Sequence, residues 1–237
     1  MESDDKLPTN KQSTADIQEF LKRVAAVPVR TRPGERGRLM FALDATASRQ
    51  PTWDQACRLQ AEMFQETASL GGLEIQLSYY RGFREFTAGD WTSDSRALTR
   101  DMTGVYCLAG ETQIEKVLRH AVGETKKKRV NALVFVGDCV EEDIDKLGAV
   151  AGELGLLGVP AFLFQEGGDA VAEFAFGQIA RLTGGAHCRF DAGSARALRE
   201  LLSAVAVYAA GGRKALENLA RDRGGASLQI AHQMKRG

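Results

Sequence analysis

The chain has 237 residues, of which 44% are hydrophobic and 26% are charged, and its 31 basic side chains balance its 31 acidic ones. This length and balance are typical of a globular protein with one large α/β domain or two small domains. The zero net charge excludes the broad basic field with which proteins attract nucleic acid, and no apolar stretch reaches the roughly 18 residues of a membrane span.

The N-terminal segment and the cysteines indicate where the protein resides. Residues 1–16 are polar and contain no apolar core, so they do not form a secretory signal. The four cysteines are far apart, no C-x-x-C pair occurs, and no two of the three histidines have metal-ligand spacing. We therefore expect a cytoplasmic protein with reduced thiols and no zinc cluster.

The spacing of apolar residues predicts helices and strands that alternate along the chain. In chain order, the predicted elements are a helix from residue 13 that ends before Pro28, a strand at 38–43, a helix at 51–70, two β-type runs at 73–80 and 84–91, helices at 93–104 and from 112, a strand at 130–138, a helix at 141–155, a strand at 159–167, a helix at 169–185, a strand at 186–190 and a last helix at 192–212.

This order predicts one doubly wound α/β domain, with a mostly parallel sheet and helices on both faces. The runs at 73–80 and 84–91 are close enough to form a hairpin, which adds one antiparallel edge strand. We divide the chain into residues 1–36, a disordered start with an amphipathic helix and a connector, residues 37–212, the α/β domain, and residues 213–237, a polar extension.

Polar side chains collect where predicted strands end. Asp44, Thr46 and Ser48 follow the first strand, Thr112 lies in a turn that opens a helix, and Asp138 follows the strand at 130–138. Ligands of doubly wound sheets bind outside the carboxyl ends of the strands, so these residues are expected to converge. Two neighbouring carboxylates repel unless a cation intervenes, and Mg²⁺ takes about six oxygen ligands. The sequence therefore predicts a divalent-cation site.

This arrangement resembles the von Willebrand factor A (VWA) domain of bacterial type, also called the integrin I-type domain. Its metal-ion-dependent adhesion site (MIDAS) has D-x-S-x-S after the first strand, a distant threonine and a further aspartate. Here D-A-T-A-S, G-E-T and V-G-D supply Asp44, Thr46, Ser48, Thr112 and Asp138, within a resemblance that spans residues 38–209. The resemblance implies a Rossmann-like fold and a site for Mg²⁺, Mn²⁺ or Ca²⁺, with the three hydroxyls as direct ligands and the aspartates acting through water.

The resemblance also implies a function, from which two residues depart. A VWA domain of this kind is a binding module without catalysis, which engages an exposed Asp or Glu of a protein partner through the bound cation. Thr46 stands where serine is usual, and Arg49 stands beside the site where a small residue is common. We expect the Arg49 cation either to weaken metal binding or to help receive the acidic partner.

Two alternatives stay open. The segment 137–143, G-D-C-V-E-E-D, is similar to the G-D-x-x-x-x-D element of haloacid-dehalogenase-like phosphatases, which would make Asp44 a covalent nucleophile in a Mg²⁺-dependent phosphohydrolase. That family usually carries a general acid at the position of Thr46, and its element comes later in the chain. The second alternative is a VWA scaffold with a degenerate metal site.

Several of these residues also have a purely structural interpretation. Thr112 is a natural N-cap for the helix that follows, with Glu115 completing a capping box. Asp138 is placed to cap the helix that begins near residue 141. Cys139 has no predicted histidine partner and is expected to be a small buried thiol rather than a nucleophile.

Overall fold

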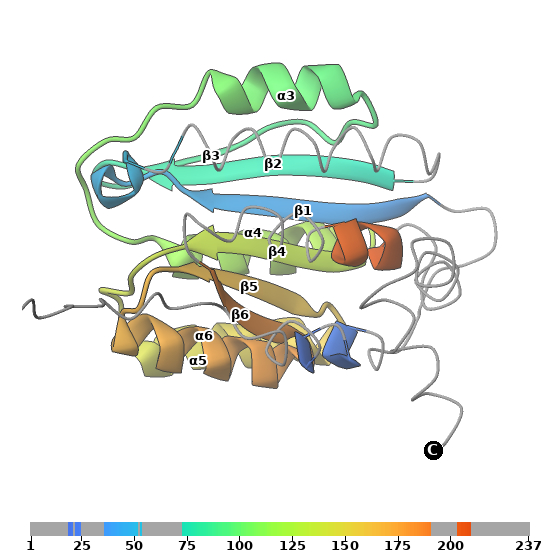
Figure 1. Cartoon of the computed structure of the whole chain (residues 1–237). Helices are drawn as coiled ribbons and strands as arrows, with labels where there is room; N and C mark the ends of the chain where they lie inside the picture. Colours follow the sequence, from blue (N-terminus) through green and yellow to red (C-terminus); the bar gives the residue numbers. More distant parts are fainter. Residues whose placement is uncertain are drawn as a thin grey trace, which may run out of the picture.

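The computed structural model describes residues 19–20, 22–24, 36–51, 53, 73–190 and 203–209. A six-stranded sheet with the order β3-β2-β1-β4-β5-β6 forms the centre of the molecule (Figure 1). The strands are β1 (Gly37–Asp44), β2 (Leu73–Arg81), β3 (Glu85–Ala88), β4 (Ala132–Gly137), β5 (Ala161–Glu166) and β6 (Ala186–Phe190). Every pair is parallel except β2 with β3 at one edge, so the predicted fold class is confirmed.

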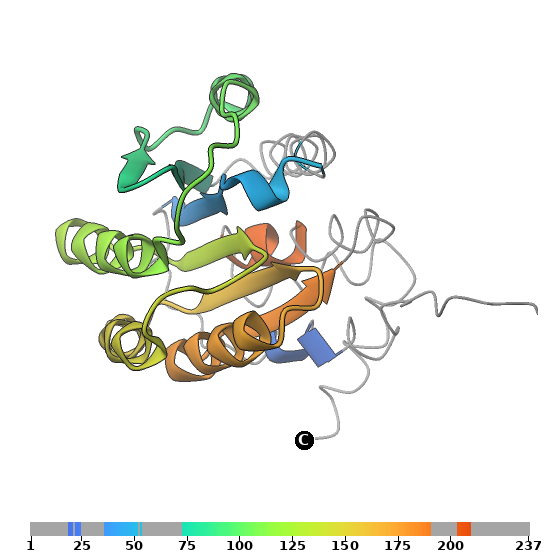
Figure 2. The same cartoon turned by 90° about the vertical axis from the view of Figure 1, so that its left-hand side faces the viewer.

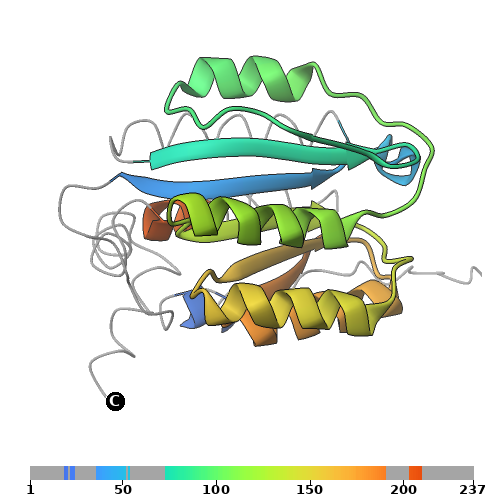
Figure 3. The same ribbon diagram turned by 180° about the vertical axis from the view of Figure 1, so that it is seen from behind.

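Four helices of the described part connect these strands. They are α3 (Ser95–Thr103), α4 (Ile114–Lys127), α5 (Ile144–Leu156) and α6 (Ala170–Thr183). Helices α4, α5 and α6 cover one face of the sheet, as the view from behind shows (Figure 3). Residues 203–209 are helical and lie on the other face. Helices on both faces are what a mostly parallel sheet requires, because each face must be shielded from water.

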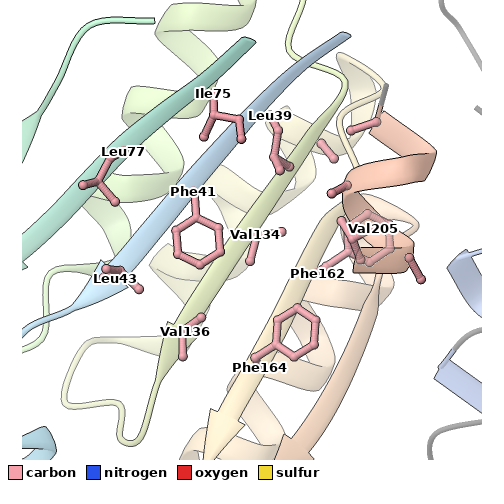
Figure 4. Packing of buried hydrophobic residues seen from close by; sticks show 14 of the residues in the cluster. Leu39, Phe41, Leu43, Ile75, Leu77, Val134, Val136, Phe162, Phe164 and Val205 are labelled. Carbon is pink, nitrogen blue, oxygen red and sulfur yellow. The ribbon is translucent and has the colours of Figure 1, made fainter. Parts of the chain in front are cut away.

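Alternating side chains of the strands divide the core in two. Leu39, Phe41 and Leu43 of β1 point to the face covered by residues 203–209, where Phe162 and Val205 meet them (Figure 4). The intervening residues of β1 point to the other face and pack against α4, α5 and α6. The buried strands therefore read as continuous apolar runs, which is why the sequence predicts them correctly.

The helix starts depart from two sequence expectations. Asp94, Asp143 and Asp169 cap α3, α5 and α6 with their side chains. Helix α4 begins after Gln113, which makes no side-chain cap, so the predicted N-cap at Thr112 with its capping box is wrong. Asp138 is not the cap of α5 either, because the turn after β4 is longer than predicted and ends at Asp143.

Some predicted segments lie wholly or partly outside the described residues. Of the predicted helix at 51–70, only Pro51 and Trp53 are described, and Trp53 is helical. The extension at 213–237 lies outside the described residues, and the three-part domain division stays a prediction. Residues 19–20 and 22–24 are helical, in line with the predicted N-terminal helix. Within the ranges that the structure describes, no helix has the length and apolar content to cross a membrane.

The strand order places a topological switch point between β1 and β4. From β1 the chain moves outward to β2 and β3, and it returns to the other side of β1 with β4. The carboxyl ends of these strands share one edge of the sheet, which faces the viewer in Figure 2. In open α/β sheets the crevice at such a switch point is the usual place for a ligand.

Candidate metal centre

Asp44 ends β1 at this switch point and is fully buried. Its Oδ1 accepts a hydrogen bond from the Thr46 backbone N–H at 2.8 Å, and its Oδ2 accepts one from the Tyr80 hydroxyl at 2.8 Å. Burial raises the pKa of Asp44, while these hydrogen bonds and the nearby Arg49 oppose the rise. Both carboxylate oxygens therefore have a fixed donor before any cation is considered.

The hydroxyls of Thr46 and Ser48 lie together just beyond the strand. Thr46 has an extended backbone and precedes the short 3₁₀ helix η1 (Ala47–Arg49), which contains Ser48. The two hydroxyl oxygens are 3.1 Å apart. Adjacent ligands of an octahedral ion, each about 2.0–2.1 Å from Mg²⁺, are separated by roughly 3 Å. The separation of this pair is compatible with two neighbouring coordination positions.

The second carboxylate comes from the loop after β4. Ligand atoms of Asp44, Asp138 and Cys139 all lie within 4.8 Å of one another. A Cβ at Gly137 would lie 3.4 Å from that of Asp44 and 2.8 Å from the Phe135 ring, so glycine permits this approach. Oδ1 of Asp138 is buried and has no hydrogen-bond partner in the described part of the chain. A buried carboxylate oxygen in this state can be satisfied by an ordered water or by a cation.

Thr112 is held near this loop by reciprocal hydrogen bonds. Its backbone N–H donates to Oε2 of Glu141 at 3.0 Å, and its hydroxyl oxygen accepts from the Glu141 N–H at 3.0 Å. Glu142 accepts from the N–H groups of Ile114 and Glu115 at 2.6 and 2.8 Å, and so caps α4 from another loop. A hydroxyl oxygen has two lone pairs, so Thr112 retains one for a cation.

Arg49 does not point toward a partner. Its side chain is fully buried, and its Nε and Nη2 each lie 3.1 Å from Oε2 of Glu166. Its Nη1 donates to the carbonyl oxygens of Asp44 at 2.9 Å and Val136 at 3.4 Å. The expectation that Arg49 receives an acidic partner is therefore wrong. The guanidinium instead joins the ends of β1, β4 and β5 beneath the candidate site.

The Cys139 thiol lies beside the carboxylates of both Asp44 and Asp138. The sequence shows that it follows Asp138 but not that it also lies near Asp44. Burial, and then the neighbouring acidic groups, raise the pKa of its thiol to about 12, which disfavours the thiolate in the metal-free protein. The two described histidines have other partners: His120 is hydrogen-bonded to Gln76 and His187 to Gln165.

The structure thus brings part of the predicted set together. Asp44, Thr46 and Ser48 are joined by hydrogen bonds, Asp138 lies against Asp44, and Thr112 is tied to the loop that follows Asp138. Sequence reasoning missed the residues that hold this set in place, namely Tyr80, Glu141, Glu142 and Glu166. Only strand register and loop contacts reveal them, since Tyr80 stands directly opposite Asp44 in the β1–β2 pair.

Comparison with known proteins supports the fold. No family model matches the sequence, and no curated protein sequence matches it. Solved structures do match. The VWA domain of SpRpn10 has a TM-score of 0.56 and 12% identity, over 73% of this chain and 94% of that one. A von Willebrand factor type A protein from Catenulispora acidiphila has a TM-score of 0.57 and 15% identity, over 73% and 43%.

A third similar structure is described with a bound metal. Proximal thread matrix protein 1 from the mussel byssus, described with a zinc-occupied MIDAS motif, has a TM-score of 0.57 and 13% identity, over 73% of this chain and 46% of that one. The present chain spans less than half the length of this protein and of the one from Catenulispora. At such identities the likeness concerns the fold alone.

Proposed function

We propose that this chain, which has the fold of the VWA domain, is a protein-binding module that engages an acidic side chain of its partner through a divalent cation. One observation carries the proposal. The Asp138 Oδ1 atom is buried without a hydrogen-bond partner among the described residues, and an oxygen of this carboxylate lies within 4.8 Å of an oxygen of Asp44. A divalent cation would satisfy that oxygen and relieve the repulsion between the two carboxylates.

The residues would divide the work as follows. Thr46, Ser48 and Thr112 would hold the ion with neutral hydroxyl oxygens, and Asp44 and Asp138 would supply negative charge through water. A bound divalent cation would supply an electrophilic centre for a carboxylate of the partner. Ser48 is exposed, whereas Thr46 and Thr112 are buried, so the partner would approach from the side of Ser48.

Mg²⁺ is the ion that we propose first, with Mn²⁺ and Ca²⁺ as alternatives, because the hydroxyls and carboxylates are hard oxygen donors. The Cys139 thiol beside the carboxylates also makes Zn²⁺ a candidate, since zinc accepts sulfur as well as oxygen. We further propose a cytoplasmic location.

A thermal titration tests the metal site. A ligand that binds only the folded state at 100 times its Kd stabilises it by about 2.7 kcal/mol, so Mg²⁺ should raise the melting temperature. Asp138→Asn should abolish the rise, whereas Asp101→Asn, an exposed change on α3, should preserve it. A wild-type melting temperature that none of Mg²⁺, Mn²⁺, Ca²⁺ or Zn²⁺ changes would instead support the degenerate scaffold.

Partner recognition needs a separate selection. A displayed peptide library with one fixed Asp is bound to the protein in Mg²⁺ and eluted with EDTA. Peptides that depend on both the metal and the fixed Asp would support the binding function. Equal recovery with and without EDTA would contradict it.

The phosphohydrolase alternative gains no support from the geometry. A nucleophilic Asp44 must reach a phosphate, yet this residue is fully buried and its two oxygens are bonded to Thr46 and Tyr80. Hydrolysis of a generic phosphate ester that required Mg²⁺ and was abolished by Asp44→Asn would restore this alternative.

A further inference from the structure

Tyr80 is a buried polar side chain to which the proposed binding mechanism assigns no task. It lies on β2 directly opposite Asp44 of β1, and its relative exposure is 0%. Its ring stacks on Phe135 of β4, with centroids 6.2 Å apart and an interplanar angle of 20°. Its hydroxyl donates to Oδ2 of Asp44 at 2.8 Å. The ring is therefore fixed by packing, and the hydroxyl points at one carboxylate oxygen.

This hydrogen bond restrains how Asp44 can serve a cation. Each Asp44 oxygen keeps a second lone pair, so the bond opposes direct coordination by fixing the orientation of the carboxylate and not by using up its acceptors. If the carboxylate turned toward the ion, the Tyr80 hydroxyl would lose its acceptor inside the core. A buried hydroxyl without a partner is unfavourable, so the bond opposes such a turn. The Thr46 N–H holds the other oxygen in the same way. Two donors also draw on the negative charge of Asp44, which makes its oxygens weaker ligands.

The chemistry of the cation depends on this restraint. Each carboxylate that coordinates a divalent ion directly lowers the ion's attraction for another carboxylate. An ion held by neutral hydroxyls and water keeps that attraction and accepts a ligand from outside more readily. A group that keeps Asp44 from direct coordination therefore strengthens binding of the partner's carboxylate and weakens binding of the metal.

We propose that Tyr80 is a positioning residue that holds Asp44 away from direct coordination, so that the cation stays receptive to a carboxylate of the partner. The inference rests on the proposed metal-dependent function and adds a residue to it. It leads to an unusual expectation. Loss of a group that supports a ligand normally weakens metal binding, by about 10–100-fold, whereas loss of the Tyr80 hydroxyl should strengthen it.

The test uses Mn²⁺ as the metal and acetate as the carboxylate probe, with the full chain. Tyr80→Phe removes the hydroxyl and keeps the ring against Phe135. Tyr79→Phe is the matched control, because Tyr79 is the neighbouring tyrosine of β2 and packs on the other face of the sheet. Mn²⁺ affinity is measured by electron paramagnetic resonance, and the waters bound to the ion are counted by water-proton relaxation.

We expect Tyr80→Phe to bind Mn²⁺ several-fold more tightly, with one bound water fewer, and to bind acetate several-fold more weakly. Tyr79→Phe should match the wild type in all three. Unchanged or weaker Mn²⁺ binding with an unchanged water count would overturn the inference and leave the metal site intact. A wild-type chain that binds no Mn²⁺ would overturn the proposed function together with the inference.

A second measurement does not depend on how well the variant folds. In a crystal structure of the unaltered protein with Mn²⁺, both Asp44 oxygens should lie beyond direct coordination distance, with water between them and the ion. A direct bond from the ion to Asp44, with the Tyr80 hydrogen bond intact, would refute the role of Tyr80 even if Tyr80→Phe does not fold.

Discussion

Two aspartates stand at the ends of neighbouring strands, and the structure treats them differently. Asp44 after β1 is fully buried, and each of its carboxylate oxygens accepts a hydrogen bond. Asp138 after β4 is half-buried, and its Oδ1 has no partner among the described residues. Both oxygens of the first carboxylate are held by the folded framework, whereas one oxygen of the second receives no hydrogen bond from the described residues. A shared motif therefore does not imply a shared physical role.

The largest effect is expected at Arg49, whose buried guanidinium donates a hydrogen bond to the carbonyl oxygen of Asp44 at the end of β1. Arg49→Met would leave Glu166, whose side chain is 12% exposed, without its partner. Breaking a buried ion pair on one side costs about 3–5 kcal/mol, so the free energy of unfolding should fall by that amount in a urea titration.

The double variant Arg49→Met with Glu166→Leu is the control for that measurement, since it leaves no buried charge behind. It should recover most of the lost stability. Equal losses in the single and double variants would show that the hydrogen bonds of Arg49 to the Asp44 and Val136 carbonyls matter more than the ion pair.

The contrast between the two aspartates is tested directly by matched substitutions in EDTA. Asp44→Asn puts an amide donor where Tyr80 or Thr46 needs an acceptor. The free energy of unfolding should therefore fall by about 1–3 kcal/mol. Asp138→Asn changes a carboxylate whose Oδ1 has no hydrogen-bond partner among the described residues, so its effect should be within about 0.5 kcal/mol or stabilising. Urea unfolding measures both, and equal losses would refute the contrast.

The smallest effect concerns the relative affinity of the candidate site for Zn²⁺ and Mg²⁺. Cys139→Ser replaces a soft sulfur beside the carboxylates with a hard oxygen. Zn²⁺ affinity should fall on the order of tenfold, while Mg²⁺ affinity should change little, because magnesium does not favour sulfur. Calorimetric titration of each metal measures this, with Cys188→Ser in β6 as the control. Equal changes for both metals would show that the thiol is not a ligand.

The sequence predicts the fold well where the signal is local. Strands β4 and β5 are continuous apolar runs, and the hairpin of β2 and β3 follows from two β-type runs beside a glycine turn. Helix α4 shows the limit, because its cap is Glu142 from a loop 27 or more residues further along the chain. No local pattern around Thr112 carries that information.

The candidate site shows the same difference between local and distant signals. Its carboxylates and hydroxyls are visible in the sequence because they form a motif with a fixed order. The groups that fix their geometry are not visible, because Tyr80 reaches Asp44 through strand register and Arg49 reaches Glu166 across 117 positions. Arg49 looks like a surface cation in the sequence, and only the packing of three strand ends shows it to be interior.

The cross-loop bonds of Glu141 and Glu142 have a mechanical consequence. They tie the segment after Asp138 to the first turn of α4, a helix of 14 residues and about 21 Å. The other end of this helix carries Lys126 and Lys127, in its last turn. A change in the position of the loop after Asp138 would therefore have to break these hydrogen bonds or move the start of α4 with it.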